Sequence, residues 1–541
     1  MLGHRDPQQS LFSAANLPHR VPADSFYGRM AAVSGVLFKD DDLKEMYDAG
    51  LGRPSIPPSL MSGVLLLQFH DDVSDEEAVQ RLMFDLRWQV ALNLPTDFPG
   101  FDPSSLTYFR QRLIEHNQER YAFDRFVKVG REAGFIPDRV TLLTDTTRTK
   151  GAGAVMDTYT LLRKGIRKLL KQCGYAAAAK QRGLSPETQR LIATYVEQDR
   201  KAKIDWTDPQ QRAAQLHVLF QDAEAALELA TEQIDDADVR STGWLLVKIL
   251  GDDITQDDQG HPQIAKGTAE DRIISITDPQ MRHGRKSSAV RFDGFKAAVT
   301  TEQSSEMIVD IQDIPAAGSD GRELLPTIAR VEQHVGVTVE RIIGDGAYGS
   351  GENRADCAQH QPDPVDLVAP LARPDDPEVD KSAFAIDLIA QTATCPQGHT
   401  VSGQAGSPKL GLPTLRFTFP RATCEACPLF KRCVKSKTAG RTVQTHPYEA
   451  DLQATRQRQQ TAEFQDVYRL RPPIERTQAE LVDHGLRHTR YLGHPKRQLQ
   501  RLWQAAAVNL QRLFRLCESH KTDLSTWLAR LGPPPVSITT A

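Results

Sequence analysis

The sequence predicts a multidomain α/β protein, and three observations support that prediction. Its 541 residues exceed the roughly 250–300 residues at which a single hydrophobic core stops growing. Its composition, with 40% hydrophobic and 25% charged residues, is typical of globular domains. Strand-like apolar runs gather at residues 136–155 and 251–365, whereas helical patterns fill the sequence before, between and after them. We therefore expect a sheet-containing core with helical additions.

Composition also excludes several classes of protein. There is no run of 18 apolar residues, and the first residues (MLGHRDPQQS) lack the charged-then-apolar pattern of a signal peptide. We therefore expect a cytoplasmic protein without membrane partners. Seven cysteines, an odd number in a long chain, argue against a disulfide framework. Because the formal net charge is −4, any nucleic-acid binding must come from local basic patches.

An N-terminal tail (residues 1–19) precedes a region of short helices at residues 20–135. Capping residues and Pro or Gly breaks predict helices over residues 24–34, 41–49, 57–70, 74–92 and 104–116. Short helices with turns between them are compatible with helix-turn-helix DNA binding, in which Arg110 and Arg112 would contact phosphates. A helical bundle with an ordinary charged exterior is the alternative, and the pattern alone does not decide between them.

The first strand of the core is predicted at residues 140–145, within a first core segment at 136–155. It is an apolar and β-branched run that ends in Asp145 and is followed by the polar sequence TTRTKGAG. A carboxylate at a strand end lies at the edge of a sheet, where a metal ion can reach it. Asp145 is therefore the first candidate catalytic acid, although a turn-forming Asp is a common alternative.

Residues 156–250 form a predicted helical insertion. An apolar stripe on its first helix indicates that one face packs, while the other face is cationic. This cationic face is a plausible track for DNA phosphates, and it carries Arg163, Lys164, Arg167 and Lys168.

Strand signals return in the second core segment (251–365) at residues 272–277, 291–300, 307–314 and 337–345, with a helix before the last strand. The loop after the first of these strands places Arg282, Arg285 and Lys286 where they could cover a substrate backbone. The last strand ends in Asp345, and the glycines that follow allow a tight turn that exposes its carboxylate. Asp345 is the second candidate acid, with a structural turn as the alternative.

A third insertion, at residues 366–450, contains a cysteine motif. Cysteines at short spacing can surround Zn²⁺ with a tetrahedron, and the expected compartment favours metal over disulfide. We expect a structural zinc knuckle, with His399 as a possible replacement for one thiol; reduced core cysteines are the less favoured alternative. The expected ligands are Cys395, Cys424, Cys427 and Cys433.

The region at residues 451–520 supplies a third acid, Glu475, and precedes a C-terminal tail at residues 521–541. Two prolines before Glu475 suit a helix start, where the helix dipole favours a carboxylate in the first turn. A basic run without acids follows, from residues 484 to 517. The expected DNA-contacting residues of this region are Tyr468, Arg471, Arg476, Arg487, Arg490 and Lys496.

The spacing Tyr468-x₂-Arg471-x₃-Glu475 resembles the Y-R-E signature of bacterial insertion-sequence transposases of the DDE class. The string DGAYGSGEN after the second strand end resembles the second-Asp motif of that family, and GRPSIPPSL and SLTYFRQRL resemble its N-terminal domain. One position departs from the pattern: Val482 stands where the family has a basic residue, and Arg476 or Arg487 would have to replace it.

The resemblance implies an RNase H-like catalytic core, with a helical N-terminal domain for DNA-end recognition or dimerisation. It also implies that Asp145, Asp345 and Glu475 cut DNA at the ends of a mobile element and join the freed 3′-hydroxyl to target DNA. Three such carboxylates can hold two Mg²⁺ or Mn²⁺ ions. The expected partners are the terminal inverted repeats and target DNA, bound by a homodimer or higher oligomer that is nucleoid-associated on DNA. A nuclease or resolvase without strand transfer, and an inactive DNA-binding derivative, are the alternatives.

Overall fold

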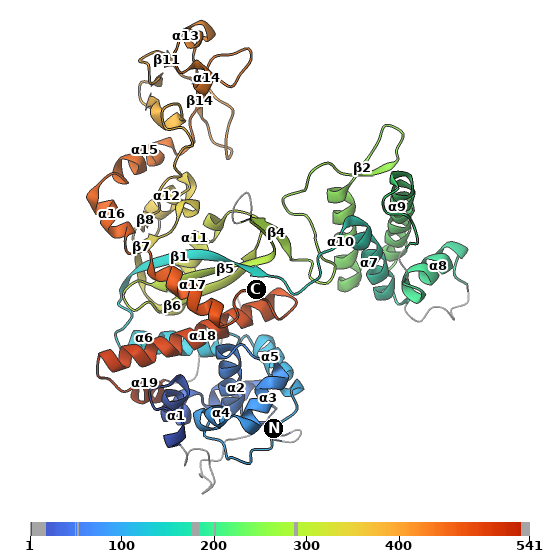
Figure 1. Cartoon of the computed structure of the whole chain (residues 1–541), viewed down its shortest axis with the longest axis vertical. Helices are drawn as coiled ribbons and strands as arrows, with labels where there is room; N and C mark the ends of the chain where they lie inside the picture. Colours follow the sequence, from blue (N-terminus) through green and yellow to red (C-terminus); the bar gives the residue numbers. More distant parts are fainter. Residues whose placement is uncertain are drawn as a thin grey trace.

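The computed structural model describes residues 18–48, 54–175, 183–199, 202–285 and 290–531, together with residues 2 and 50. A central sheet lies between an N-terminal helical domain, a helical insertion on one side and a cysteine-containing subdomain at the far end (Figure 1). Among the described residues, no helix is both long and apolar enough to cross a membrane.

The N-terminal domain is helical, as the sequence predicts. Its elements are η2 (Pro18–Arg20), α1 (Phe26–Leu37), η3 (Asp40–Met46), α2 (Pro58–His70), α3 (Asp75–Phe84), α4 (Leu86–Ala91), α5 (Ser104–Glu115) and α6 (Tyr121–Glu132). The single helix expected over residues 74–92 is wrong, because Asp85 adopts an extended conformation and its side chain caps α4 by accepting the Arg87 N–H. A break of this kind follows from the preference of Asp for capping positions.

The six-stranded sheet places strands that are distant in sequence side by side. It comprises β1 (Arg139–Lys150), β4 (Arg282–Arg285), β5 (Arg291–Glu302), β6 (Ile308–Pro315), β7 (Thr338–Ile343) and β8 (Asp366–Val368). The order is β4-β5-β1-β7-β8, and β6 also pairs with β5. β1 is antiparallel to β5 and parallel to β7, which is parallel to β8. η6 (Asp320–Glu323) and α11 (Leu324–Val335) connect β6 to β7.

Two strand predictions need correction. β1 does not end at Asp145 but continues to Lys150, because β5 pairs with it along that whole length. The run at residues 272–277 is not a strand; its backbone pairs with no neighbouring strand, and it is held by isolated contacts such as the Met156 N–H to the Ile274 carbonyl at 2.9 Å. Its isoleucines are nevertheless buried, which explains the strand-like pattern.

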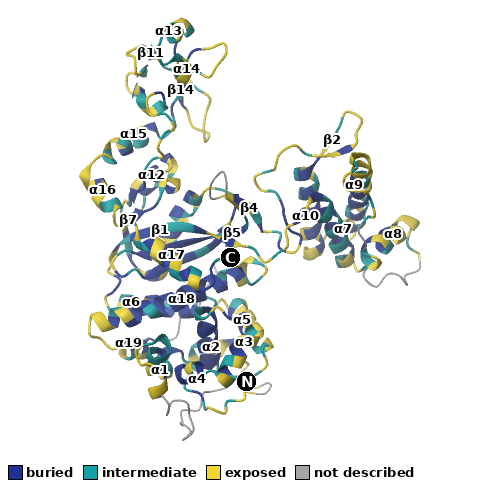
Figure 2. Ribbon diagram, in the orientation of Figure 1, coloured by how far each residue is buried: buried dark blue, intermediate teal, exposed yellow. Residues whose placement is uncertain are grey.

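The C-terminal helices join the sheet to the N-terminal domain. They are α15 (Glu449–Arg458), α16 (Ala462–Tyr468), α17 (Pro473–Asp483), α18 (His494–Ser519) and α19 (Leu524–Arg530), after η7 (Gly346–Tyr348) and α12 (Gly351–Ala358). α18 runs between the sheet and the N-terminal helices and is buried along most of its length (Figure 2). One continuous hydrophobic core therefore extends from the N-terminal domain through α18 into the sheet.

The two insertions have cores of their own. The helical insertion contains α7 (Thr158–Gln172), α8 (Pro186–Leu191), η5 (Ile192–Glu197), α9 (Pro209–Thr231), α10 (Ala237–Asp253), β2 (Ile254–Gln256) and β3 (Pro262–Ile264). The other contains η8 (Lys381–Ala383), β9 (Ala385–Asp387), β10 (Thr392–Thr394), β11 (Thr400–Ser402), β12 (Gln404–Ala405), β13 (Leu415–Thr418), α13 (Arg421–Glu425), α14 (Phe430–Cys433) and β14 (Thr442–Gln444). Residues 385–444 are called the Cys-rich subdomain below.

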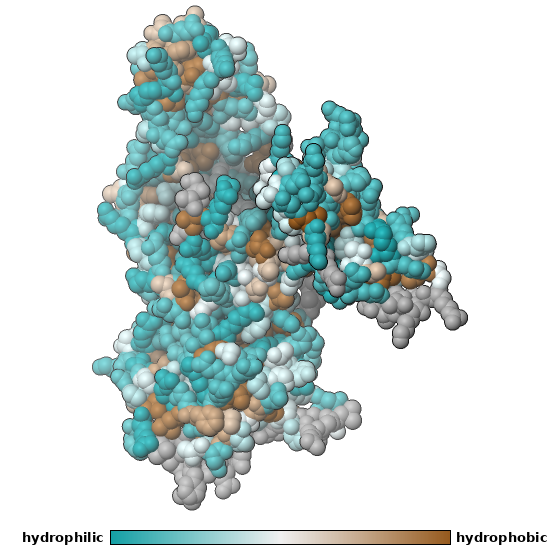
Figure 3. Space-filling model, turned by 45° about the vertical axis from the view of Figure 1, so that its right-hand side comes forward, coloured by the Kyte–Doolittle hydropathy of each residue, from teal (hydrophilic) through white to brown (hydrophobic). Residues whose placement is uncertain are grey.

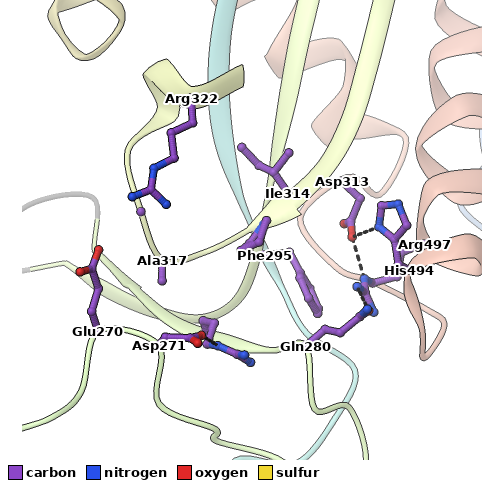
Figure 4. Close-up of a pocket in the computed structure, with 13 residues that line it drawn as sticks. Glu270, Asp271, Gln280, Phe295, Asp313, Ile314, Ala317, Arg322, His494 and Arg497 are labelled. Atoms are coloured by element: carbon purple, nitrogen blue, oxygen red, sulfur yellow. Dashed lines mark hydrogen bonds and ion pairs between the residues drawn. The ribbon is translucent and has the colours of Figure 1, made fainter. Parts of the chain in front are cut away.

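Three arginines of the expected basic C-terminal surface are buried instead. Arg497 forms ion pairs with Asp278 at 3.0 Å and Asp313 at 2.8 Å, and Arg501 lies 3.5 Å from Asp313. Arg512 is buried beside Glu480 at 2.9 Å. A cavity of about 470 Å³ opens onto the Asp313 cluster, with Phe295 in its wall (Figure 4). The pairs with Asp313 hold α18 against β6, and the pair of Arg512 with Glu480 holds it against α17.

Candidate active site

The three candidate acids face a common cavity of about 530 Å³. Asp145 lies two residues beyond Leu143, and Asp345 lies two residues beyond Ile343; these two hydrophobic residues form the last pair between the parallel strands β1 and β7. Because each Asp follows its member of this pair by two residues, both carboxylates lie at the same edge of the sheet. Glu475 reaches the cavity from the first turn of α17, where Pro473 occupies an N-terminal position.

The turn after β7 fixes the direction of Asp345. Its Oδ1 accepts the Ala347 N–H at 2.8 Å and so caps η7. Gly344 is required before it, because a Cβ there would lie 2.8 Å from the Tyr348 ring. Ser350 caps α12 by accepting the Asn353 N–H at 3.1 Å.

Arg471 links two of the three acids. Its Nη2 donates to Asp145 Oδ2 at 2.6 Å, and its Nη1 donates to Glu475 Oε1 at 3.0 Å. The Glu475 side chain is 66% exposed, whereas that of Asp145 is 16% exposed. Of the two carboxylates, that of Asp145 is therefore largely buried, whereas that of Glu475 is exposed to solvent.

Burial raises the pKa of the Asp145 carboxyl to about 6. The Arg471 guanidinium opposes this shift, while the negative charges of Asp345 and Asp320 add to it. Desolvation and like charges both disfavour an ionised carboxylate, so a cation placed among these acids would relieve the cost. The donor set consists of hard oxygens, which fits Mg²⁺ or Mn²⁺.

A fourth acid, Asp320, and a lysine, Lys296, also line this cavity, and the sequence did not single out either one. The Lys296 Nζ donates to Asp320 Oδ1 at 2.6 Å and to the Gly318 carbonyl at 3.0 Å. Thr146, next to Asp145, donates its hydroxyl to the other oxygen of Asp320. The one available signal was the position of Lys296 next to the apolar residues Phe295, Ala297, Ala298 and Val299 of its strand.

Three arginines also line the cavity, together with uncharged residues such as Thr147, Phe292 and Gln478. Arg148, Arg285 and Arg487 line it, and no described carboxylate forms an ion pair with any of them. Arg487 donates to Thr147 Oγ1 at 2.8 Å and to the Arg148 carbonyl at 3.1 Å, which orients its guanidinium along the cavity. Arg476, the other candidate to replace the basic residue absent at Val482, pairs with Glu306 at 2.5 Å and is not among the lining residues.

Other predicted DNA-contacting residues lie elsewhere, and many have acidic partners. Arg110 is buried against Asp75; Arg163 and Arg167 pair with Asp199; Arg282 pairs with Asp271; Arg490 pairs with Asp72. Arg112 stacks on Tyr47. Tyr468 is half-buried and stacks on Phe464, whereas Lys164, Lys168 and Lys496 have no ion pair with a described residue. Lys286 lies outside the described residues.

The four candidate zinc ligands come together in the Cys-rich subdomain. Cys395, Cys424, Cys427 and Cys433 line a small cavity of about 30 Å³, and His399 lines it too. Burial raises the pKa of the Cys433 thiol; Arg441 opposes the shift and the other three thiols add to it. The Arg441 backbone N–H donates to Cys424 Sγ at 3.5 Å. Soft donors gathered in a small cavity suit Zn²⁺.

As the side chains stand, no three His, Cys, Asp or Glu residues in the described ranges are already arranged to hold a metal ion. In the acidic cavity, the space between Asp145 and Glu475 is bridged by the Arg471 guanidinium. The chemistry of both donor sets nevertheless fits a metal ion.

Two family comparisons match parts of the chain. Residues 15–112 match the family described as transposase domain (DUF772), and residues 394–514 match the family described as transposase DDE domain. The second match includes the cysteines and Glu475 but neither Asp145 nor Asp345. No curated protein and no solved structure matches the chain.

Proposed function

We propose that the chain is a DDE transposase of an insertion sequence, since two parts of it match transposase families, and that it cuts DNA at the ends of such an element and joins the 3′-hydroxyl ends to target DNA. The observation that carries the proposal is the composition of one cavity: the three candidate acids and Asp320 share it with three arginines that form no ion pair with a described carboxylate. Carboxylates hold cations, and arginines hold phosphates.

The arrangement of the sheet supports an RNase H-like core. Three antiparallel strands (β6, β5 and β1) continue into two parallel strands (β7 and β8), with a helix between β6 and β7. In this proposal, Asp145 and Asp345 meet at the sheet edge, and α17 adds Glu475 from above the same edge.

Asp145, Asp345 and Glu475 are the residues that would hold two divalent cations, Mg²⁺ or Mn²⁺. Bound there, the cations would activate the attacking oxygen and stabilise the leaving oxygen of an in-line displacement. The residues of the chain itself bind and orient the DNA. Arg148, Arg285 and Arg487 reach phosphates on either side of the cleaved one, and Arg487 replaces the basic residue absent at Val482.

We further propose that Cys395, Cys424, Cys427 and Cys433 hold a structural Zn²⁺, with His399 at the rim of the site. We propose that the N-terminal domain recognises the terminal inverted repeat or forms a homodimer, since both element ends must be held together for joining. Lys164, Lys168 and Lys496 remain available for phosphates because no described acid neutralises them.

The test is a strand-transfer assay. Purified protein is incubated with labelled DNA that carries the element's ends and with a plasmid target, in the presence and absence of Mg²⁺. We expect Mg²⁺-dependent end cleavage and joined products. Cleavage without joining would favour a nuclease or resolvase, and binding without any metal-dependent chemistry would contradict the catalytic assignment.

The Asp320→Asn substitution is expected to slow cleavage by about 10–100-fold, the usual cost of removing a residue that orients a metal ligand. Loss of the carboxylate charge weakens the hydrogen bonds that residue 320 accepts from Lys296 and from Thr146, the neighbour of Asp145. The Mg²⁺ concentration for half-maximal cleavage should rise, while DNA binding without Mg²⁺ is kept. Asp356→Asn, on α12 outside the cavity, serves as the matched control.

A further inference from the structure

The Cys-rich subdomain carries a charge opposite to that of the whole chain. Residues 385–444 contain eight lysines and arginines but only two acids, Asp387 and Glu425, whereas the full chain has a net charge of −4. A charge of this size confined to one projecting subdomain creates a local field that the rest of the surface does not share. The subdomain projects from the core beyond α12 and α15 (Figure 1).

Three of the eight cations contact residues of the subdomain itself or residues 376–379, which precede it. Arg421 pairs with Glu425 at 2.7 Å, and Arg432 pairs with Asp376 and Glu378, each at 2.6 Å. Arg441 donates to the Cys433 and Val379 carbonyls. The other five are exposed, and none forms an ion pair with a described residue: Lys409, Arg416, Lys431, Lys435 and Lys437.

These five charges occupy two parts of the subdomain, which pack on the same small core through Phe417 of β13 and Cys433 of α14. Lys431, Lys435 and Lys437 lie on α14 and in the segment directly after it. Arg416 lies on β13 opposite Gln444, while the adjacent Phe417 is buried, and Lys409 lies in the hairpin before β13. Hydrophilic side chains predominate over the visible face of this subdomain at the top of Figure 3.

We propose that these five residues, called the basic surface, bind the phosphate backbone of double-stranded DNA outside the catalytic cavity. The inference rests on the proposed function, which makes DNA the substrate. The aromatic rings support a duplex over a single strand, because bases of a single strand stack on exposed rings. Here Phe417 and Phe419 are buried, and Phe430 lies under the Arg421 guanidinium.

The basic surface also suits backbone contact better than base reading or a protein partner. Lysine is a flexible point charge, which fits phosphate oxygens without reading sequence. Protein interfaces are usually anchored by large aromatic side chains, and none of the three phenylalanines in residues 385–444 is exposed. The subdomain would hold the duplex that leads into or away from the cut site.

The test measures binding of the full-length, zinc-loaded protein to a mixed-sequence duplex across a salt series, without Mg²⁺ and without chelator. The association constant falls as salt concentration rises, and the slope of its logarithm against the logarithm of salt concentration is the quantity measured. The triple variant Lys431→Gln, Lys435→Gln, Lys437→Gln is expected to reduce the magnitude of this slope by about three, since each phosphate contact contributes about one. Affinity at moderate salt should fall at least about tenfold. The pair Lys409→Gln, Arg416→Gln should reduce the magnitude of the slope by about two.

The matched control is Lys44→Gln, Lys203→Gln, Lys266→Gln, which removes the same charge from exposed positions outside the subdomain. We expect it to retain nearly the wild-type salt dependence. A Lys→Arg version of the basic-surface triple should restore binding. If the basic-surface triple behaved like the control, or changed only self-association in sedimentation, the DNA assignment would be wrong. The binding measurement requires no DNA cleavage or joining, so its outcome is independent of the outcome of the strand-transfer assay.

Discussion

Asp145→Asn is expected to reduce end cleavage at least about 1,000-fold, and Asp345→Asn and Glu475→Gln are expected to do the same. Each substitution keeps the shape of the side chain but removes one charge from the set that would hold the cations. Stabilisation of developing charge by such cations is worth several kcal/mol, and each 1.36 kcal/mol changes a rate tenfold. The measurement is the single-turnover rate of end cleavage at saturating Mg²⁺ and DNA.

Measurements of folding stability distinguish a loss of catalysis from misfolding. Asp145 is the most informative position for this comparison. Its folded pKa of about 6 lies above its ordinary value of 3.8, because burial disfavours the ionised form. The folded state thus binds more protons than the unfolded state between these values, and stability falls as pH rises through that window. Above about pH 6 the full cost of the ionised group is present.

An Asn at this position avoids that cost at every pH. Asp145→Asn is therefore expected to melt at a higher temperature than the wild type at pH 7.5 without Mg²⁺, and the difference should shrink as the pH falls from 6 toward 4. Thermal unfolding at several pH values provides the measurement. An inactive variant that melted well below the wild type at pH 7.5 would indicate a structural role for Asp145 instead.

The three candidate acids could be selected from the sequence because the residues directly around each of them form a recognisable local pattern. A strand before Asp345 and a glycine-rich turn after it are visible in consecutive residues, and Pro473 marks the start of the helix that carries Glu475. The end of β1 was misplaced because strand length here depends on pairing with β5, which lies about 150 residues away in the chain. Periodicity within residues 140–145 contains no information about that partner.

Residues that depend on tertiary contacts could not be found in this way. Arg471 was expected to contact DNA, but it also bridges two acids, one of which lies far away in the sequence. Asp320 and Lys296 come from different elements and meet only when η6 packs beside β5. Arg497 and Arg501 resembled surface charges because sequence alone does not show that Asp313 is buried opposite them. Long-range pairing of charges is decided by the fold.

If the four cysteines hold zinc as proposed, its removal is expected to unfold the Cys-rich subdomain while the central sheet stays folded. The hydrophobic core of this subdomain has only five buried residues, namely Phe384, which directly precedes it, and Ala393, Phe417, Phe419 and Val443. Burial of a large apolar side chain contributes about 1.5–3 kcal/mol, whereas each ordered residue costs about 1.5 kcal/mol in conformational entropy. So small a core cannot order its loops and short strands unless metal binding supplies folding free energy.

Hydrogen exchange of the Cys427→Ser variant, and of the wild type treated with a zinc chelator, measures this effect. We expect fast exchange of the described amides in residues 385–444, with protection kept in β1, β5 and β7, because the sheet shares its core with α18 and the N-terminal domain rather than with the cysteines. Cys517→Ser, at a buried cysteine on α18 far from the four thiols in sequence, is the matched control and should leave the subdomain protected. Zinc content measured by elemental analysis should fall only in the Cys427 variant. Unchanged exchange after zinc removal would mean that the small core and the ion pairs of Arg432 are sufficient, and that the thiols do not determine the fold of this subdomain.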